Sequence, residues 1–225
     1  MAGVITSNGT GGGVFSADAT WAGAPPTAPA SSSDGFTILD GDVVTMSASW
    51  DGDLICTVAS GGTLNVTNSA ELSITGGAGR LNVDGTLDVQ DGTLTITSAV
   101  GSTWSATGAV WLGTGCTLTH TSAQISIAGS FYTYGSATTT DTNLGGLTGT
   151  IHLRGGSIVL AGSASILATG GAEIVVSAGT LVTGGNSSVR LYSGSKFVPK
   201  RRGAFGPIDN LEAYGTVAGP VRIGA

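Results

Sequence analysis

Short apolar segments recur along the chain about every eight residues, and this rhythm limits the possible folds severely. In the second half, successive segments begin their apolar alternation 8, 8, 7 and 8 positions apart, at Ile158, Ile166, Ile174, Leu181 and Val189. Alternation of apolar and polar residues is the pattern of a half-buried β-strand. Because only one to three small residues separate these segments, no helix fits between them. The sequence therefore predicts an all-β protein.

The same rhythm runs through the first half, where five segments begin at Leu64, Leu72, Leu81, Leu87 and Leu94. Two architectures accommodate such strands. One is a short right-handed parallel β-helix, in which coils of roughly 16–25 residues stack on one another. The other is an antiparallel β-sandwich. The Asp-Gly pairs that mark tight hairpins lie only in the first half. We therefore favour the β-helix and keep the sandwich as the alternative.

The strand rhythm divides the chain into three parts. Residues 1–35 contain a glycine-rich stretch and three prolines, which predict an irregular, extended N-terminal arm. Residues 36–194 form the β-helix domain, although residues 99–150 are less regular and 138–142 resemble a polar loop. Residues 195–225 break the rhythm and are interpreted as a C-terminal cap or tail over the last coil.

Composition and charge exclude several classes of protein. Only 10% of the 225 residues are charged, and the net charge is −6, which argues against binding to nucleic acid. No apolar run approaches the roughly 18 residues of a membrane-spanning helix, and the first residues lack the pattern of a signal peptide. Two cysteines, Cys56 and Cys116, are too few for a disulfide scaffold, so we expect buried thiols.

The acidic residues and histidines offer weak signals for a metal or catalytic site. Three acidic groups could bind Ca²⁺ or act as acid and base: Asp40 with Asp42, Asp51 with Asp53, and Asp84 with Asp88 and Asp91. They flank glycine corners, however, where aspartate is common because its side chain caps turns. His120 and His152 could share a site on adjacent coils, but no further ligand motif surrounds them. We expect no metal, no cofactor and no catalytic residue.

Aromatic and basic clusters are better candidates for contact with a partner. The aromatic residues Trp104, Trp111, Phe131, Tyr132 and Tyr134 could pack in the core, form a carbohydrate platform or form a subunit interface. The basic residues Lys196, Lys200, Arg201 and Arg202 could contact an acidic partner surface or remain solvated. They contrast with residues 1–100, whose net charge is −9. In the arm, Val14, Phe15 and Trp21 are apolar anchors for docking on its own domain or on a neighbouring subunit.

The opening segment resembles that of β-helical proteins of tailed bacteriophages and bacterial surfaces. The matching residues are Phe15, Ser16, Thr20, Trp21, Pro25, Pro26, Asp34, Ile38, Gly41 and Val44. The resemblance covers about 36 residues. It implies a β-helical structural protein of the virion, not an enzyme, made in the host cytoplasm and carried as a decoration (cement) protein on the capsid surface.

That function implies the major capsid protein as partner and a homotrimer as the assembly, with no nucleic acid or membrane bound. The partner-binding residues would then be Val14, Phe15, Trp21, Lys196, Lys200, Arg201 and Arg202. A carbohydrate-binding tail or adhesin module is the second hypothesis, and a glycan-degrading β-helix enzyme is the third.

Overall fold

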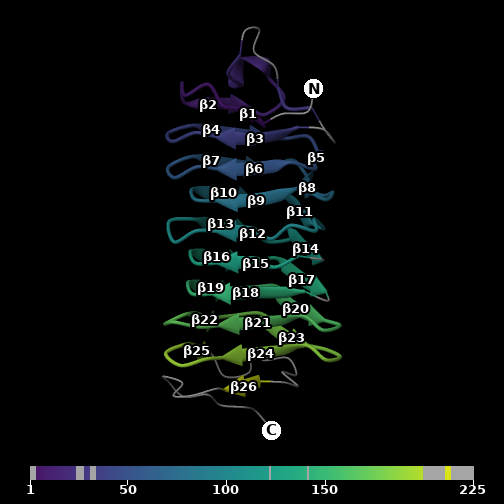
Figure 1. Ribbon diagram of the computed structural model, residues 1–225, viewed down its shortest axis with the longest axis vertical. Helices are drawn as coiled ribbons and strands as arrows, with labels where there is room; N and C mark the ends of the chain where they lie inside the picture. Colours follow the sequence, from purple (N-terminus) through teal and green to yellow (C-terminus); the bar gives the residue numbers. More distant parts are fainter. Residues whose placement is uncertain are drawn as a thin grey trace.

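The chain folds into an all-β solenoid of about seven coils, in which each coil contributes one strand to each of three parallel sheets (Figure 1). This computed structural model describes residues 4–23, 28–30, 34–121, 123–140, 142–199 and 211–213. Within these described ranges, the one helical element is a single 3-10 turn, η1 (Asp18–Thr20). The prediction of a parallel β-helix is confirmed, and parallel pairing between the strands excludes the antiparallel sandwich.

From β3 to β25, the strands of the three sheets follow one another in strict rotation along the chain. Sheet 1 contains β1 (Val4–Thr6), β3 (Gly35–Ile38), β6 (Ile55–Val58), β9 (Arg80–Val83), β12 (Ser102–Trp104), β15 (Ile125–Ile127), β18 (Asn143–Leu147), β21 (Ser165–Ala168), β24 (Ser188–Leu191) and β26 (Leu211–Ala213). Sheet 2 contains β2 (Gly12–Val14), β4 (Val43–Met46), β7 (Thr63–Val66), β10 (Thr86–Val89), β13 (Ala109–Leu112), β16 (Ser130–Thr133), β19 (Thr150–Leu153), β22 (Glu173–Val176) and β25 (Lys196–Pro199). Sheet 3 contains β5 (Trp50–Gly52), β8 (Ala70–Ile74), β11 (Gly92–Ile96), β14 (Thr117–Thr121), β17 (Ser136–Thr140), β20 (Ser157–Ala161) and β23 (Thr180–Thr183).

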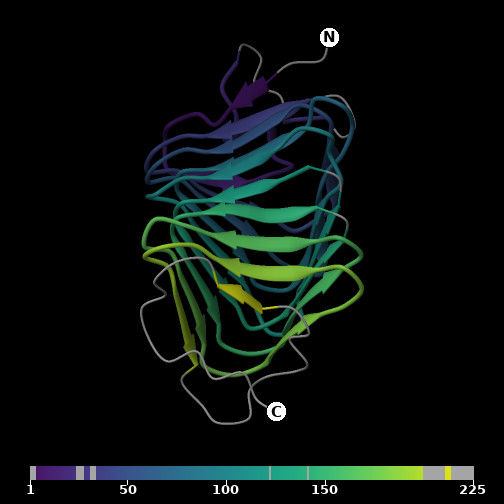
Figure 2. The same cartoon turned by 60° about the horizontal axis from the view of Figure 1, so that its bottom comes forward.

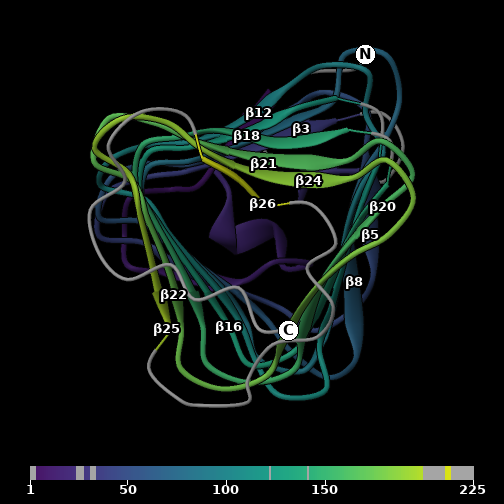
Figure 3. The same ribbon diagram turned by 90° about the horizontal axis from the view of Figure 1, so that it is seen from below.

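Successive coils stack in register and enclose a triangular core (Figures 2 and 3). The N-terminal strands β1 and β2 pair with β3 and β4 across 31 positions, as in Val4 with Gly35. From β3 onward, residues that pair across neighbouring coils are 19 positions apart at the closest, as in Ile125 with Leu144, and 25 at the widest, as in Cys56 with Leu81. The coil length agrees with the predicted range. The region 99–150 continues the stack without interruption, so the polar loop predicted for 138–142 is wrong at 138–140, which belong to β17.

Alternation along each strand sends every second side chain into the core. On sheet 2, one inward column runs through Leu64, Leu87, Val110, Phe131, Ile151 and Ile174, all of which are buried. Each such side chain stabilises the fold by about 1.5–3 kcal/mol relative to an exposed position. Cys56 and Cys116 are free and buried, as predicted, and burial raises the pKa of the Cys56 thiol to about 12.

A column of glycines forms the corner between sheets 1 and 2. Gly85, Gly108, Gly129 and Gly149 each precede a strand of sheet 2, and the backbone of the neighbouring coil passes close to each. A Cβ atom on Gly108 would lie 2.0 Å from the carbonyl oxygen of Val83, and one on Gly149 would lie 2.0 Å from that of Gly129. Coil stacking therefore requires glycine here, which accounts for part of the chain's high glycine content.

The N-terminal segment closes one end of the solenoid instead of extending from it (Figure 1). Strand β1 pairs with β3 and β2 pairs with β4, both in parallel. Phe15 and Trp21 are buried against Phe36 and Trp50, with ring centroids 5.1–5.6 Å apart in the three contacts of Phe15. The prediction of an extended arm is therefore wrong for residues 4–23. The aromatic anchors pack on the chain's own first complete coil, because the apolar core would otherwise be exposed to solvent at this end of the solenoid.

A buried carboxylate fixes this segment to the first coil. Asp42 accepts hydrogen bonds from the Ser7 hydroxyl and from the backbone N–H groups of Gly9 and Gly11. Burial alone would raise the pKa of Asp42, but these hydrogen bonds outweigh it and lower the pKa below 3.8. In the sequence, Asp42 looks like an ordinary turn aspartate beside a glycine. In the structure it connects the N-terminal segment to the first coil.

The C-terminal end of the described solenoid lies beyond the predicted domain boundary at residue 194. Strand β25 (Lys196–Pro199) pairs with β22, and β26 (Leu211–Ala213) pairs with β24. The β-helix therefore includes at least residues 196–199, which were assigned to the cap or tail. The rest of that predicted segment, residues 200–210 and 214–225, lies outside the described residues.

Replacing Asp42 tests its role in holding the N-terminal segment. Asp42→Asn should lower the free energy of unfolding by about 2 kcal/mol, because it weakens charge-assisted hydrogen bonds to buried donors. The wild-type protein should lose this contribution as the pH falls below about 3.8. In that range the unfolded chain has a protonated Asp42, whereas the lowered pKa keeps Asp42 charged in the folded protein until the pH falls further. Denaturant titrations at neutral and acid pH measure both effects. Asp40→Asn, on the exposed neighbouring turn, is the matched control, and an equal loss there would contradict this role.

His120 makes a second pH-dependent contribution to the free energy of unfolding. It lies inside the solenoid on β14, its Nε2 is 2.5 Å from the carbonyl oxygen of Ala123, and burial lowers its pKa below 6.5. A histidine that stays neutral in the fold but is protonated when unfolded makes stability fall as the pH drops below about 6.5. We expect His120→Gln to flatten the stability profile between about pH 7.5 and pH 5. An unchanged slope in the variant would show that another group titrates.

Candidate functional site on sheet 2

The outer surface of sheet 2 carries a row of side chains in register on four neighbouring strands. Asp88 on β10 pairs with Trp111 on β13, Trp111 with Tyr132 on β16, and Tyr132 with His152 on β19. The rings of Trp111 and Tyr132 stack with centroids 3.8 Å apart, and those of Tyr132 and His152 with centroids 4.5 Å apart. We call Asp88, Trp111, Tyr132 and His152 the aromatic row. It follows the long axis of the solenoid.

Strand alternation explains which aromatic residues reach this surface. Phe131 and Tyr132 are consecutive, so one points into the core and the other outward. Phe131 packs against Trp104 inside the solenoid, with ring centroids 5.4 Å apart and both side chains buried. Of the three interpretations of the aromatic cluster, core packing therefore holds for Trp104 and Phe131. Trp111, Tyr132 and Tyr134 lie on the surface.

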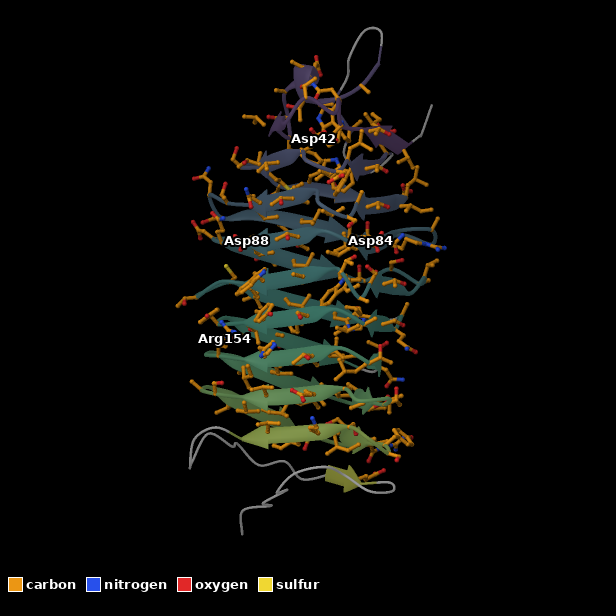
Figure 4. All side chains as sticks on the ribbon, turned by 90° about the vertical axis from the view of Figure 1, so that its left-hand side faces the viewer. Asp42, Asp84, Asp88 and Arg154 are labelled. Carbon is orange, nitrogen blue, oxygen red and sulfur yellow. The ribbon has the colours of Figure 1, made fainter. Side chains whose placement is uncertain are left out.

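Arg154 lies beside the aromatic row, just after β19 (Figure 4). The central carbon of its guanidinium is 4.8 Å from the centre of the Tyr132 ring and 5.8 Å from that of Trp111. Its Nη1 also donates to the Tyr134 hydroxyl over 3.2 Å. These contacts hold an exposed cation in a defined position against aromatic surface.

The charge on Arg154 has no acidic partner among the described residues. Two other described basic residues form ion pairs there: Arg190 with Glu212 and Lys196 with Glu173, both at 3.0 Å. The contacts of Arg154 are instead with neutral rings and a phenol hydroxyl. Because arginine offers five N–H donors, its planar fork retains donors for an external acceptor.

The stacking of the rings determines what they offer to a ligand. The faces of Tyr132 lie against Trp111 on one side and His152 on the other, so the ring edges face outward. Ring edges carry the positive part of the aromatic quadrupole, and the Tyr132 hydroxyl adds a donor. Asp88, whose carboxylate accepts a hydrogen bond from Gln90 over 2.7 Å, ends the row. The arrangement therefore favours polar recognition over stacking on a flat platform.

The structure separates the partner-binding residues predicted from sequence. Phe15 and Trp21 are buried in the chain's own core, whereas Val14 is 48% exposed. Lys196 lies on β25 and is paired with Glu173. Lys200, Arg201 and Arg202 lie outside the described residues. Of the apolar anchors, Val14 alone is available for contact with another molecule.

The acidic residues and histidines do not converge in the described part of the chain. Asp84 lies at the corner between β9 and β10, whereas Asp88 lies near the end of β10 (Figure 4). Asp42 is hydrogen-bonded to the N-terminal segment. His120 is inside the solenoid and His152 is on its surface, so they share no site. Among the described residues, no group of three or more histidine, cysteine or acidic side chains could hold a metal ion. No helix there is long and apolar enough to span a membrane.

Sequence reasoning did not find Arg154 or its association with the aromatic row. The signal was present in the spacing: Trp111 and Tyr132 are 21 residues apart, and Tyr132 and His152 are 20 apart. Both intervals match one coil of this solenoid. Using them requires the coil length, which varies from coil to coil and is known only from the register.

Comparison of the chain with models of protein families, with curated proteins and with solved structures finds no match. The fold and the side-chain geometry are therefore the basis for assigning a function.

Removing the Tyr132 ring tests how much stacking in the aromatic row contributes to the free energy of unfolding. Tyr132→Thr places another residue with high β-propensity on the strand but removes two stacked contacts, so we expect a loss of about 2 kcal/mol in unfolding free energy. Tyr134→Thr removes an exposed tyrosine outside the stack and should cost less than about 0.5 kcal/mol. Chemical denaturation of both variants makes the comparison. Equal effects would mean that stacking adds nothing beyond ordinary burial.

Proposed function

We propose that the protein is a non-catalytic structural protein of a bacteriophage particle, a decoration protein that docks on the major capsid protein by its N-terminal end. The observation that carries the proposal is the distribution of exposed apolar side chains. Among the described residues, the six most exposed large hydrophobic residues include four near that end: Val4, Val14, Val43 and Ile55, all 39–49% exposed. Exposed apolar side chains gathered near one end of a rod favour attachment there.

Two pairs of these residues lie on adjoining sheets. Val14 on β2 and Val43 on β4 lie on sheet 2, and Val4 on β1 and Ile55 on β6 lie on sheet 1. The aromatic cap beneath them is fixed by Asp42, so the end is a preformed surface. A preformed surface loses little conformational entropy on binding, which favours stable attachment.

The sequence resemblance supports the same proposal through the cap. Phe15, Trp21, Ile38 and Val44, which carry the likeness to phage and bacterial surface β-helices, are all buried in the first layers of the solenoid. They therefore serve to close the end of the coil stack. The proposal includes the homotrimer as the assembly on the particle, since virion proteins commonly sit on symmetry axes.

Capsid binding by an N-terminal variant tests the proposal. We expect the protein in purified particles of the phage that encodes it, and we expect the isolated protein to saturate undecorated heads. The double variant Val14→Asp and Val43→Asp should reduce head binding by about 100-fold, because it introduces charge into an apolar contact. Co-sedimentation with undecorated heads measures this.

Val182→Asp on the outer face of β23 is the matched control and should bind like the wild type. Circular dichroism and the melting temperature establish that each variant is folded. Absence of the protein from purified particles, or unchanged head binding by the double variant, would contradict the proposal.

A further inference from the structure

We infer that the aromatic row and Arg154 form a binding site for an acidic oligosaccharide, with Arg154 contacting a carboxylate of the sugar. This site lies on sheet 2 several coils away from the N-terminal docking end, so the inference stands independently of the capsid proposal. It assigns the protein a second activity, recognition of an acidic glycan.

Arg154 is the element that selects an anion. It is exposed, it has no acidic partner among the described residues, and three aromatic side chains hold it: Trp111, Tyr132 and Tyr134. A guanidinium that is already oriented binds a carboxylate through two parallel hydrogen bonds with little further loss of side-chain entropy. A neutral ligand would leave this preorganised charge unused.

The rest of the row suits the hydroxyl groups of a sugar chain. Asp88 and Gln90, already hydrogen-bonded to each other, present an acceptor and an amide at one end, whereas the guanidinium of Arg154 lies beside the Tyr132 and Trp111 rings. Three coil spacings of about 4.8 Å separate Asp88 from His152, so the row is about 14 Å long. That length fits a short oligosaccharide lying along the solenoid axis, with its carboxylate toward Arg154.

Charge distribution favours a carbohydrate over an acidic protein as the occupant. The acidic N-terminal coils carry most of the chain's negative charge, with a net −9 over residues 1–100, and Asp88 belongs to them. A broad acidic protein surface would be repelled by these negative charges over the whole contact area. A narrow chain with separate carboxylates places one of them at Arg154 and neutral hydroxyls at Asp88.

Binding of paired acidic and neutral glycans to the full chain tests the inference. The probes are oligosaccharides of galacturonate, glucuronate, mannuronate and sialic acid, each compared with its own methyl-esterified form, by glycan array and calorimetry. We expect at least one acid form to bind at least about tenfold more tightly than its ester, because esterification removes the charge-assisted hydrogen bonds. The inference fails if no acid form binds, or if the esters bind equally well.

Variants locate the site. Arg154→Gln should weaken binding of the acid form about tenfold or more, and Arg154→Lys should restore it only in part, since lysine lacks the planar fork. Arg190→Gln on sheet 1 is the matched control and should bind like the wild type. Melting temperatures establish that all three variants are folded, and light scattering reports their assembly. If Arg154→Gln changes the oligomeric state instead of glycan binding, the row is a subunit interface and the inference is overturned.

Discussion

Parallel hydrogen bonding between successive coils is the constraint from which the other features of this molecule follow. Each strand inside the stack pairs with the equivalent strand one coil earlier and one coil later, so its residues have fixed neighbours on both sides. Like positions therefore form columns along the whole rod. One column supplies the apolar core, another supplies the corner glycines, and a third supplies the stacked rings of sheet 2.

The same bonding would leave the first complete coil unpaired on one side, and the N-terminal segment covers that side. An exposed end layer would present unpaired backbone groups and open apolar surface. Strands β1 and β2 pair with the first complete coil, and Phe15 with Trp21 covers its apolar layer. Glycines 9 and 11 donate to Asp42 where the chain crosses between these strands. The N-terminal segment has almost no strand pattern in its sequence, and it is ordered by its strand pairing and apolar packing against the first complete coil.

The strands could be predicted from sequence wherever their inward positions are apolar. Where inward positions are polar, the alternation is interrupted and the strands were harder to recognise. Leu181 and Val189 point inward from adjacent strands, so the rhythm is visible there. In the middle of the chain, His120 and Thr139 occupy paired inward positions on β14 and β17 and interrupt the pattern. The candidate site was only partly predictable. Tyr132 and Trp111 are recognisable as a cluster, but Arg154 joins them through coil register and not through nearness in sequence.

Column formation also determines what kind of ligand such a surface can recognise. A site on a globular domain gathers side chains from several directions around one point, whereas columns on a solenoid place them along a line. The aromatic row has its acceptor, Asp88, at one end, and the cation of Arg154 lies farther along it, beside the stacked rings of Tyr132 and Trp111. Such a line distinguishes the two directions of a chain-like ligand. Stacking against neighbouring rings also keeps each ring oriented before the ligand arrives, so binding loses little side-chain entropy. These properties suit an extended polymer better than a small, compact molecule.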